Sequence, residues 1–243
     1  MSAPQFFADP ADLGGELAVL HGEEARHAAQ VLRLKAGERL LVADGRGRVA
    51  EATAVAVSRD EVRARVTAVR TVPPRRPALT VVVGLVKGGK LDLVVQKLTE
   101  LGVERVAPAL CRRSVVAWDE AKRAAARERW AAIALAAAKQ SRRALVPEIA
   151  PVAALADQVA AAPAPRLVCW EAGGRPLSAA LPAEPPAALT LVIGPEGGLE
   201  AAEVAACQAA GAEPVSLGPL VLRAETAAIA TAAAVAFRYG HLG

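Results

Sequence analysis

Aromatic residues are scarce in this sequence, since Phe, Trp and Tyr together make up 3% of its 243 residues. Proteins that bind single-stranded nucleic acid without sequence preference stack bases on such rings, so the composition argues against an aromatic stacking platform. Hydrophobic residues nevertheless reach 53% and charged residues 22%. A chain of this length and composition is not intrinsically disordered, and it can bury a core built mainly of alanine and valine.

Cysteine and histidine are also scarce. Cys111, Cys169 and Cys207 lie 58 and 38 residues apart, which fits neither a disulfide framework nor a CxxC metal site. The three histidines are scattered, and no serine lies in a GxSxG motif. We therefore expect no bound metal and no serine nucleophile.

Long apolar runs are missing as well. The longest uninterrupted run, residues 131–138, is far too short to span a bilayer. The first residues lack the basic and then apolar pattern of a signal peptide. These features, together with the few cysteines, predict a soluble, cytoplasmic protein that has no membrane partner.

Positive charge is concentrated in the middle of the chain. Residues 77–147 hold 13 Lys+Arg against 6 Asp+Glu, whereas residues 148–243 hold 4 against 9 and residues 1–76 hold 12 against 10. A basic segment beside an acidic one indicates a surface that faces a polyanion next to a separate ligand site. Ordinary solvated helix faces would explain the same charges.

The first 70 residues predict a small β-barrel with one helix. Short apolar runs separated by turn signals, at 40–43, 49–57 and 62–69, are typical of strands joined by hairpins. A helix is expected over residues 22–32. Its apolar face would comprise Ala25, Ala28, Ala29 and Leu32. Three prolines within residues 71–77 form a linker, so we expect domains at 1–72 and 73–243.

The second domain is expected to be an α/β domain. Apolar strands are predicted at 79–86, 103–110, 166–170, 189–193 and 215–217, and helices at 91–101, 119–142, 200–210 and 225–239. Apolar strands that alternate with helices indicate a parallel sheet covered on both faces. Ligands of such sheets bind at the carboxyl ends of the strands.

A glycine-lysine turn follows the first of these strands. Residues 84–91 (GLVKGGKL) match the phosphate-loop pattern GxxxxGK, but Leu91 stands where Mg²⁺ needs a Ser or Thr hydroxyl. A nucleoside triphosphatase is therefore disfavoured. Two readings remain: a flexible basic turn, or a contact of Lys87 and Lys90 with backbone phosphates.

Two further glycine loops lie between a strand and a helix. In residues 191–199 (LVIGPEGGL) Glu196 would repel phosphates, so a neutral or cationic ligand fits better, such as an adenosyl group that bears a sulfonium and an ammonium. A plain tight turn is the alternative. The second junction, residues 217–227, gathers Arg223, Glu225 and Thr226 at the start of an apolar helix. A glutamate there also suits the helix dipole.

Basic residues at two element ends complete the pattern. Arg112 and Arg113 follow a strand, and Gln140 and Arg142 lie where the long helix ends. Arginine in a last helical turn complements the helix dipole and is uninformative alone. Combined with the glycine-lysine turn, these residues predict a strip that binds phosphates.

Six stretches in order carry a family resemblance: residues 27–37 (HAAQVLRLKAG), 96–103 (QKLTELGV), 113–116 (RSVV), 140–142 with 146–149 (QSR and VPEI), 193–198 (IGPEGG), and 217–219 with 222–227 (LGP and LRAETA). Through them the whole chain resembles the bacterial 16S ribosomal RNA uridine N3-methyltransferases of the SPOUT class. It departs from that pattern at Gln5, where an arginine is usual, and at Leu220, where an arginine often follows Leu-Gly-Pro.

The resemblance implies an N-terminal PUA-like barrel, a SPOUT domain with a C-terminal trefoil knot, and a homodimer formed through the knot region. It implies S-adenosylmethionine as cofactor and the 16S ribosomal RNA of the small ribosomal subunit as partner. The cofactor residues would be Ile193, Gly194, Pro195, Gly197, Gly198, Leu217, Gly218, Leu222 and Thr226. The RNA-binding residues would be Arg26, Arg33, Lys87, Lys90, Arg112, Arg113, Gln140 and Arg142.

Methylation of uracil N3 requires removal of its proton. Arg223 would stabilise the negative charge that develops on the uracil oxygens, and Glu225 or Glu196 would accept the proton. Other SPOUT reactions, on transfer RNA or on a ribose 2′-hydroxyl, and a non-catalytic RNA-binding module remain as alternatives.

Overall fold

The computed structural model describes residues 3–13, 15–114 and 118–242, and these residues form two compact units. The first unit comprises residues 1–74 and 138–146, and the second comprises residues 75–137 and 147–243. Residues 138–146 thus group with the N-terminal part of the chain. The expected domain limits, 1–72 and 73–243, stay a prediction.

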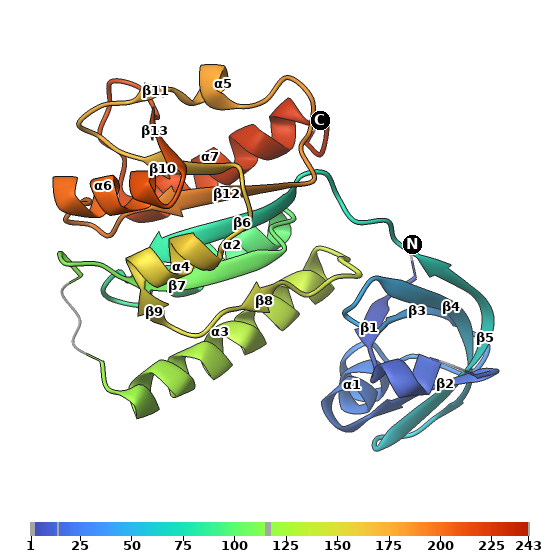
Figure 1. Cartoon of the computed structure of the whole chain (residues 1–243). Helices are drawn as coiled ribbons and strands as arrows, with labels where there is room; N and C mark the ends of the chain where they lie inside the picture. Colours follow the sequence, from blue (N-terminus) through green and yellow to red (C-terminus); the bar gives the residue numbers. More distant parts are fainter. Residues whose placement is uncertain (1–2, 14, 115–117, 243) are drawn as a thin grey trace. The chain divides into compact units, whose positions relative to one another are not determined.

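The first unit is built on a curled sheet with the order β1-β3-β4-β5-β2, five-stranded in the described residues (Figure 1). The elements are β1 (Gln5–Phe7), η1 (Pro10–Leu13), β2 (Leu17–His21), α1 (Gly22–Arg26), η2 (His27–Val31), β3 (Arg39–Ala43), β4 (Arg48–Val57) and β5 (Glu61–Thr71). β1 pairs with β3 in parallel, and the other pairs are antiparallel. Buried Phe6, Leu20 and Leu40 belong to its core.

The helix expected over residues 22–32 is interrupted. The α-helix α1 ends at Arg26, and η2 is a π-helix, in which the amide of Leu32 donates to the carbonyl of His27 at 3.0 Å. A π-turn holds more residues than an α-turn, so the expected apolar face does not continue to its end. Leu32 is 45% exposed and Leu34 is buried instead.

The second unit contains an eight-stranded sheet among the described residues, and every strand pair in it is parallel. The strands are β6 (Ala78–Gly84), β7 (Arg105–Leu110), β8 (Glu148–Ile149), β9 (Ala153–Ala154), β10 (Arg166–Cys169), β11 (Arg175–Pro176), β12 (Ala188–Ile193) and β13 (Ala212–Ser216). The order is β11-β13-β10-β12-β6-β7-β8, with β9 beside β7. The predicted parallel sheet is confirmed.

Helices cover both faces of this sheet (Figure 1). They are α2 (Lys90–Glu100), α3 (Glu120–Gln140), α4 (Leu155–Ala161), α5 (Leu177–Ala180), α6 (Ala201–Ala209) and α7 (Ala224–Arg238). Val82 and Val192 point into a core shared with α4 and α6. Side chains alternate along a strand, so the intervening residues of β6 and β12 face the other side, where α2 and α7 pack together. Within the described residues, no helix combines the length and apolarity needed to cross a membrane.

Candidate cofactor and catalytic site

A cavity of about 210 Å³ opens at one edge of the second unit's sheet. β10 lies between β12 and β13, and because all three strands are parallel, the loops that follow them leave the sheet at the same edge. These three loops form the cavity wall, which comprises Cys169–Glu171, Ile193–Leu199, Ser216–Leu222, Ala224 and Ala227. The two glycine loops noted in the sequence therefore meet.

Most of the expected cofactor residues share this cavity. Its lining includes Ile193, Gly194, Pro195, Gly197, Gly198, Leu217, Gly218 and Leu222, but not Thr226, which is exposed on the first turn of α7. Sequence reasoning did not place the segment Cys169–Glu171 in the cofactor site, because the glycines that follow β10, Gly173 and Gly174, lie beyond this segment. Only the strand order shows that this segment lies between the two glycine loops.

The glycines also make room for the protein's own side chains. A Cβ atom on Gly197 would lie 3.0 Å from the Cβ of Arg113, and one on Gly84 would lie 2.6 Å from the backbone nitrogen of Pro195. The first glycine of the phosphate-loop pattern therefore packs against the loop that follows β12. A side chain at 197 would therefore crowd Arg113 whether or not a ligand is bound.

Two carboxylates and a lysine meet beside the cavity. The ammonium of Lys90 donates to Oε1 of Glu196 at 3.0 Å and lies 3.9 Å from Oε1 of Glu225. The backbone amide of Lys87 also donates to Oε1 of Glu196, at 3.2 Å. The glycine-lysine turn thus binds a carboxylate of its own chain in the position where a phosphate loop binds phosphate.

Glu196 and Glu225 differ in how well their oxygens are satisfied. Burial opposes ionisation of Glu196, but the hydrogen bonds from Lys90 and from the amide of Lys87 outweigh it, so the pKa of Glu196 lies below its ordinary value. Oε2 of Glu225 is buried and has no hydrogen-bond partner among the described residues. A buried polar oxygen without a partner in the protein is uncommon, and a bound water or ion, a ligand, or a role in catalysis accounts for it.

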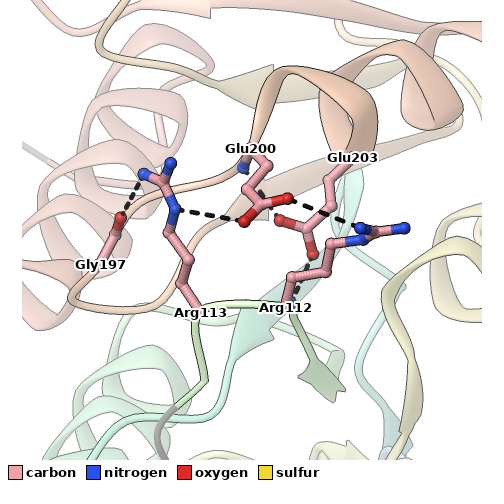
Figure 2. Close-up of polar contacts among 5 residues, drawn as sticks. All are labelled: Arg112, Arg113, Gly197, Glu200 and Glu203. Carbon is pink, nitrogen blue, oxygen red and sulfur yellow. Dashed lines mark hydrogen bonds and ion pairs between the residues drawn. The ribbon is translucent and has the colours of Figure 1, made fainter.

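A network of ion pairs ties the turn after β7 to the cavity loop (Figure 2). The guanidinium of Arg113 donates to the carbonyl of Gly197 at 3.0 Å, and its Nε lies 3.6 Å from Oε1 of Glu200. Nη1 of Arg112 lies 3.8 Å from Oε2 of Glu200, and its backbone amide donates to Glu203 at 2.9 Å. Both arginines were expected to bind RNA phosphates. Arg113 contacts the loop that lines the cavity, and Arg112 contacts the start of α6, which follows that loop.

The charged partner of Glu225 is Lys90. Arg223 is the N-cap residue of α7, its side chain is exposed, and it forms no ion pair with the described residues. Its guanidinium is therefore free to meet a substrate. Leu220, one of the two departures from the family pattern, is 77% exposed.

The remaining RNA-binding candidates lie in the first unit. Arg26, Arg33, Gln140 and Arg142 are all exposed, and an ion pair between Lys139 and Glu24 ties the end of α3 to α1. Gln5, the other departure, donates to the carbonyl of Arg143 at 2.7 Å. Of the motif at 113–116, the last two residues lie outside the described residues.

Comparisons with known proteins agree with this arrangement. A family model described as an RNA methyltransferase domain matches residues 74–236, and one described as an RNA methyltransferase PUA domain matches residues 20–67. The ribosomal RNA small subunit methyltransferase E of Mycobacterium bovis is 38% identical over 242 residues, which cover 97% of this chain and 92% of that protein.

Two solved structures are similar throughout. The ribosomal RNA small subunit methyltransferase E of Neisseria gonorrhoeae, bound to S-adenosyl methionine, matches with a TM-score of 0.86 at 26% identity over 98% of both chains. A methyltransferase of Legionella pneumophila, also in complex with S-adenosylmethionine, matches with a TM-score of 0.84 at 32% identity over 97% of both chains.

The fold and these matches define the class of the protein as an RNA methyltransferase with an N-terminal PUA domain. The predicted α/β fold with an N-terminal PUA domain and a methyltransferase domain is therefore confirmed. Within this class, the chain belongs to the ribosomal RNA small subunit methyltransferase E family. The family membership that the six sequence stretches indicated is thereby confirmed as well.

Proposed function

We propose that this protein transfers the methyl group of S-adenosylmethionine to N3 of a uridine in the 16S RNA of the small ribosomal subunit. The observation that carries the proposal is a cavity next to the cluster of Lys90, Glu196 and Glu225. In this cluster one buried oxygen of Glu225 has no partner among the described residues. A cofactor site next to a proton acceptor is what methylation of an N–H group requires.

The chemistry of the cavity suits this cofactor. Glu171 and Glu196 line it, and no lysine or arginine appears in the lining that the described residues provide. A site of this charge attracts the sulfonium and ammonium groups of S-adenosylmethionine and disfavours a polyphosphate. When bound, the cofactor supplies an electrophilic methyl group, whereas proton removal and charge stabilisation fall to the side chains of this chain.

Glu225 is the better candidate for the general base. Oε1 of Glu196 already accepts hydrogen bonds from Lys87 and Lys90, and its lowered pKa makes it a weaker base. Oε2 of Glu225 remains available. Glu196 then acts as a positioning residue, which holds Lys90 beside Glu225.

In this proposal Arg223 and Lys90 balance the negative charge of the uracil anion. Loss of the N3 proton spreads negative charge onto the two ring oxygens. The exposed guanidinium of Arg223 forms no ion pair with the described residues, so it is able to turn toward such an oxygen. Preorganised donors of this kind supply a large part of many rate enhancements.

The test uses purified protein, S-adenosylmethionine labelled in its methyl group, and small ribosomal subunits from cells that lack this activity. Mass spectrometry of the nucleosides should show label in N3-methyluridine. Label in a 2′-O-methylated nucleoside, or only in transfer RNA, would contradict the proposed reaction. Glu225→Gln should abolish transfer, whereas Glu196→Gln should retain part of it, and both variants should still bind the cofactor.

A homodimer formed through a C-terminal knot is part of the proposal. Within the described residues, β13 lies on the far side of β10 from β12, a crossover that a threaded chain requires. The apolar side chains of Leu220, Val221 and Phe237 are 77%, 86% and 73% exposed. Phe237 also lines an apolar cleft together with Leu217 and Leu222, and exposed apolar surface of this kind is typical of an interface. Phe237→Asp should shift the sedimentation coefficient to that of a monomer, and an unchanged dimer would contradict this interface.

The RNA contacts complete the proposal. Arg26, Arg33, Gln140 and Arg142 offer an exposed basic surface on the PUA-bearing unit, and cytoplasmic ribosomes are the place of action. Substitution of Arg26 and Arg142 by alanine should reduce the steepness of log affinity for RNA against log salt concentration by about 0.7–0.9 per lost phosphate contact. An unchanged salt dependence would move the RNA-binding surface elsewhere.

A further inference from the structure

A second cleft, of about 430 Å³, lies beside the glycine-lysine turn, in the second unit. Two of the three tryptophans of the chain meet there. The rings of Trp118 and Trp130 stack with centroids 5.9 Å apart and planes inclined by 29°. Trp130 is buried, whereas Trp118 is only half-buried, so Trp118 is the ring that a ligand could reach.

Positive side chains surround this ring. Lys87, Lys122 and Arg129 all line the cleft and are exposed. The ammonium of Lys122 lies 5.6 Å from the centre of the Trp118 ring. Among the described residues, neither Lys87 nor Lys122 has a carboxylate within ion-pair distance. Unpaired cations beside an accessible aromatic ring favour a ligand that is both planar and anionic.

Asp92 fixes the floor of the cleft. One of its carboxylate oxygens accepts hydrogen bonds from the indole nitrogen of Trp130 at 3.0 Å and from Arg129 at 2.8 Å. This carboxylate is thereby committed to holding the buried ring in place. The cations Lys87 and Lys122 keep the cleft positively charged, and Trp130 supports the ring of Trp118 from below.

The cleft and the candidate catalytic cluster share one short segment. The backbone amide of Lys87 donates to Glu196, and Lys90 contacts both Glu196 and Glu225, while the side chain of Lys87 lines the cleft. Gly88 and Gly89, with φ of +68° and +72°, make the tight turn that connects the two positions. A group bound in the cleft is therefore an immediate neighbour of the group that Glu225 would deprotonate.

We propose that this cleft binds a nucleotide of the RNA substrate that flanks the methylated uridine, with its base against Trp118 and its phosphate at Lys87 and Lys122. The inference rests on the proposed function, because it takes the substrate to be RNA. It assigns Trp118, Lys122 and Arg129 to substrate recognition. The glycine-lysine turn then contacts the flanking nucleotide through Lys87 and the candidate catalytic cluster through Lys90.

The binding test measures fluorescence anisotropy of a labelled oligouridylate with the full-length protein. Trp118→Leu should weaken binding by roughly 5- to 100-fold, the usual loss for one base-aromatic stack, and Trp118→Phe should restore most of it. Lys122→Ala should lower the salt dependence by about 0.7, the value for one phosphate contact of a single strand. An abasic oligonucleotide should bind Trp118→Leu and wild type equally well.

Arg105→Ala is the matched control. Arg105 starts β7 and pairs with Glu148 at 2.7 Å, so it lies at the sheet edge opposite the strand ends that carry the cleft, and its loss removes the same charge. If Trp118→Leu and Lys122→Ala bind the oligonucleotide as tightly as Arg105→Ala does, the cleft is not a nucleotide site. Lys122 is exposed, so that variant gives an answer even if Trp118→Leu fails to fold.

Methyl transfer separates the two proposals. The variants should raise KM for small ribosomal subunits and leave kcat and cofactor affinity unchanged. If the wild type methylates the RNA and both variants match the control, only the cleft assignment fails. If the wild type transfers no methyl group to ribosomal RNA, yet Trp118→Leu still weakens oligouridylate binding, only the proposed function fails.

Discussion

Replacement of Arg113 tests whether this arginine holds the cavity loop or binds RNA. Its guanidinium contacts the carbonyl of Gly197 at 3.0 Å and Glu200 at 3.6 Å, and its side chain is 51% exposed. A hydrogen bond from a charged donor contributes about 1.5–3 kcal/mol, and an exposed ion pair contributes about 0–1 kcal/mol. Since solvent screens both contacts here, Arg113→Ala should destabilise the observed conformation of the cavity loop by about 1–2 kcal/mol.

That loss translates into a measurable change in cofactor affinity. Each 1.4 kcal/mol is a factor of ten in the binding constant, so calorimetry with S-adenosylmethionine should show affinity lowered by roughly 5- to 30-fold. Arg113→Lys should recover only part of it, because one ammonium lacks the fork that spans Gly197 and Glu200. The melting temperature should change little.

Arg112→Ala is the control for the charge. Arg112 is 70% exposed and lies 3.8 Å from Glu200, but its guanidinium does not reach Gly197. Its amide, which holds Glu203, survives the substitution. Our reasoning would be refuted if the Arg113→Ala and Arg112→Ala variants bound the cofactor with equal affinity. If, in addition, Arg113→Ala lowered the slope of log affinity for RNA against log salt concentration by about 0.7–0.9, Arg113 would be a phosphate ligand.

Three further predictions concern single side chains. Arg223→Ala should lower turnover by roughly 10²–10³, the usual loss for one preorganised donor, with an unchanged melting temperature; wild-type turnover would contradict its catalytic role. Folding lowers the pKa of Glu196 below its ordinary 4.5, so its stabilising effect is complete above that pH and is lost as pH falls through the lowered pKa. The melting temperature of the wild type should accordingly fall more steeply below pH 4.5 than that of Glu196→Gln, and parallel curves would refute this. Burial raises the pKa of Cys169 from 9.0 to about 12, although Thr231 partly offsets it, so iodoacetamide at pH 8 should alkylate it about a thousandfold more slowly than a free thiol; fast alkylation would show that the thiol is not desolvated.

The elements with strong periodicity could be predicted from the sequence, and the departures from it could not. The strands β3 to β7, β10 and β12 follow from apolar runs, because such runs have few alternatives in a buried sheet. Short strands such as β1 and β2 carry too little pattern to be recognised. The π-helix η2 escaped prediction because it leaves composition unchanged and alters only the register, which buries Leu34 in place of Leu32.

The candidate site, too, could be predicted where the sequence carries a local pattern and not where it depends on tertiary contacts. Glycine loops mark where a chain turns sharply, so two of the three loops that form the cavity could be predicted from the sequence. The partner of each charge was not visible, because ion pairs depend on which strand ends become neighbours. The sequence predicts that Lys90 contacts a phosphate, but in the structure it lies between Glu196 and Glu225. The same holds for Trp118 and Trp130, whose proximity no composition figure could show.

Residues 138–146 belong to the first unit although they lie more than 60 residues after its other part, and this affects synthesis and folding of the chain. This segment closes onto the curled sheet through hydrogen bonds from Gly47 to Ala144 and from Val146 to Gly45, at 3.2 and 3.0 Å. A ribosome that synthesises this chain releases the PUA part long before the segment that completes it. The N-terminal unit is therefore incomplete until all of α3 and the six residues after it have been synthesised, and a fragment cut at the proline linker lacks this segment. Fragments and chimaeras that are to contain the complete unit need residues 138–146 supplied as a separate piece.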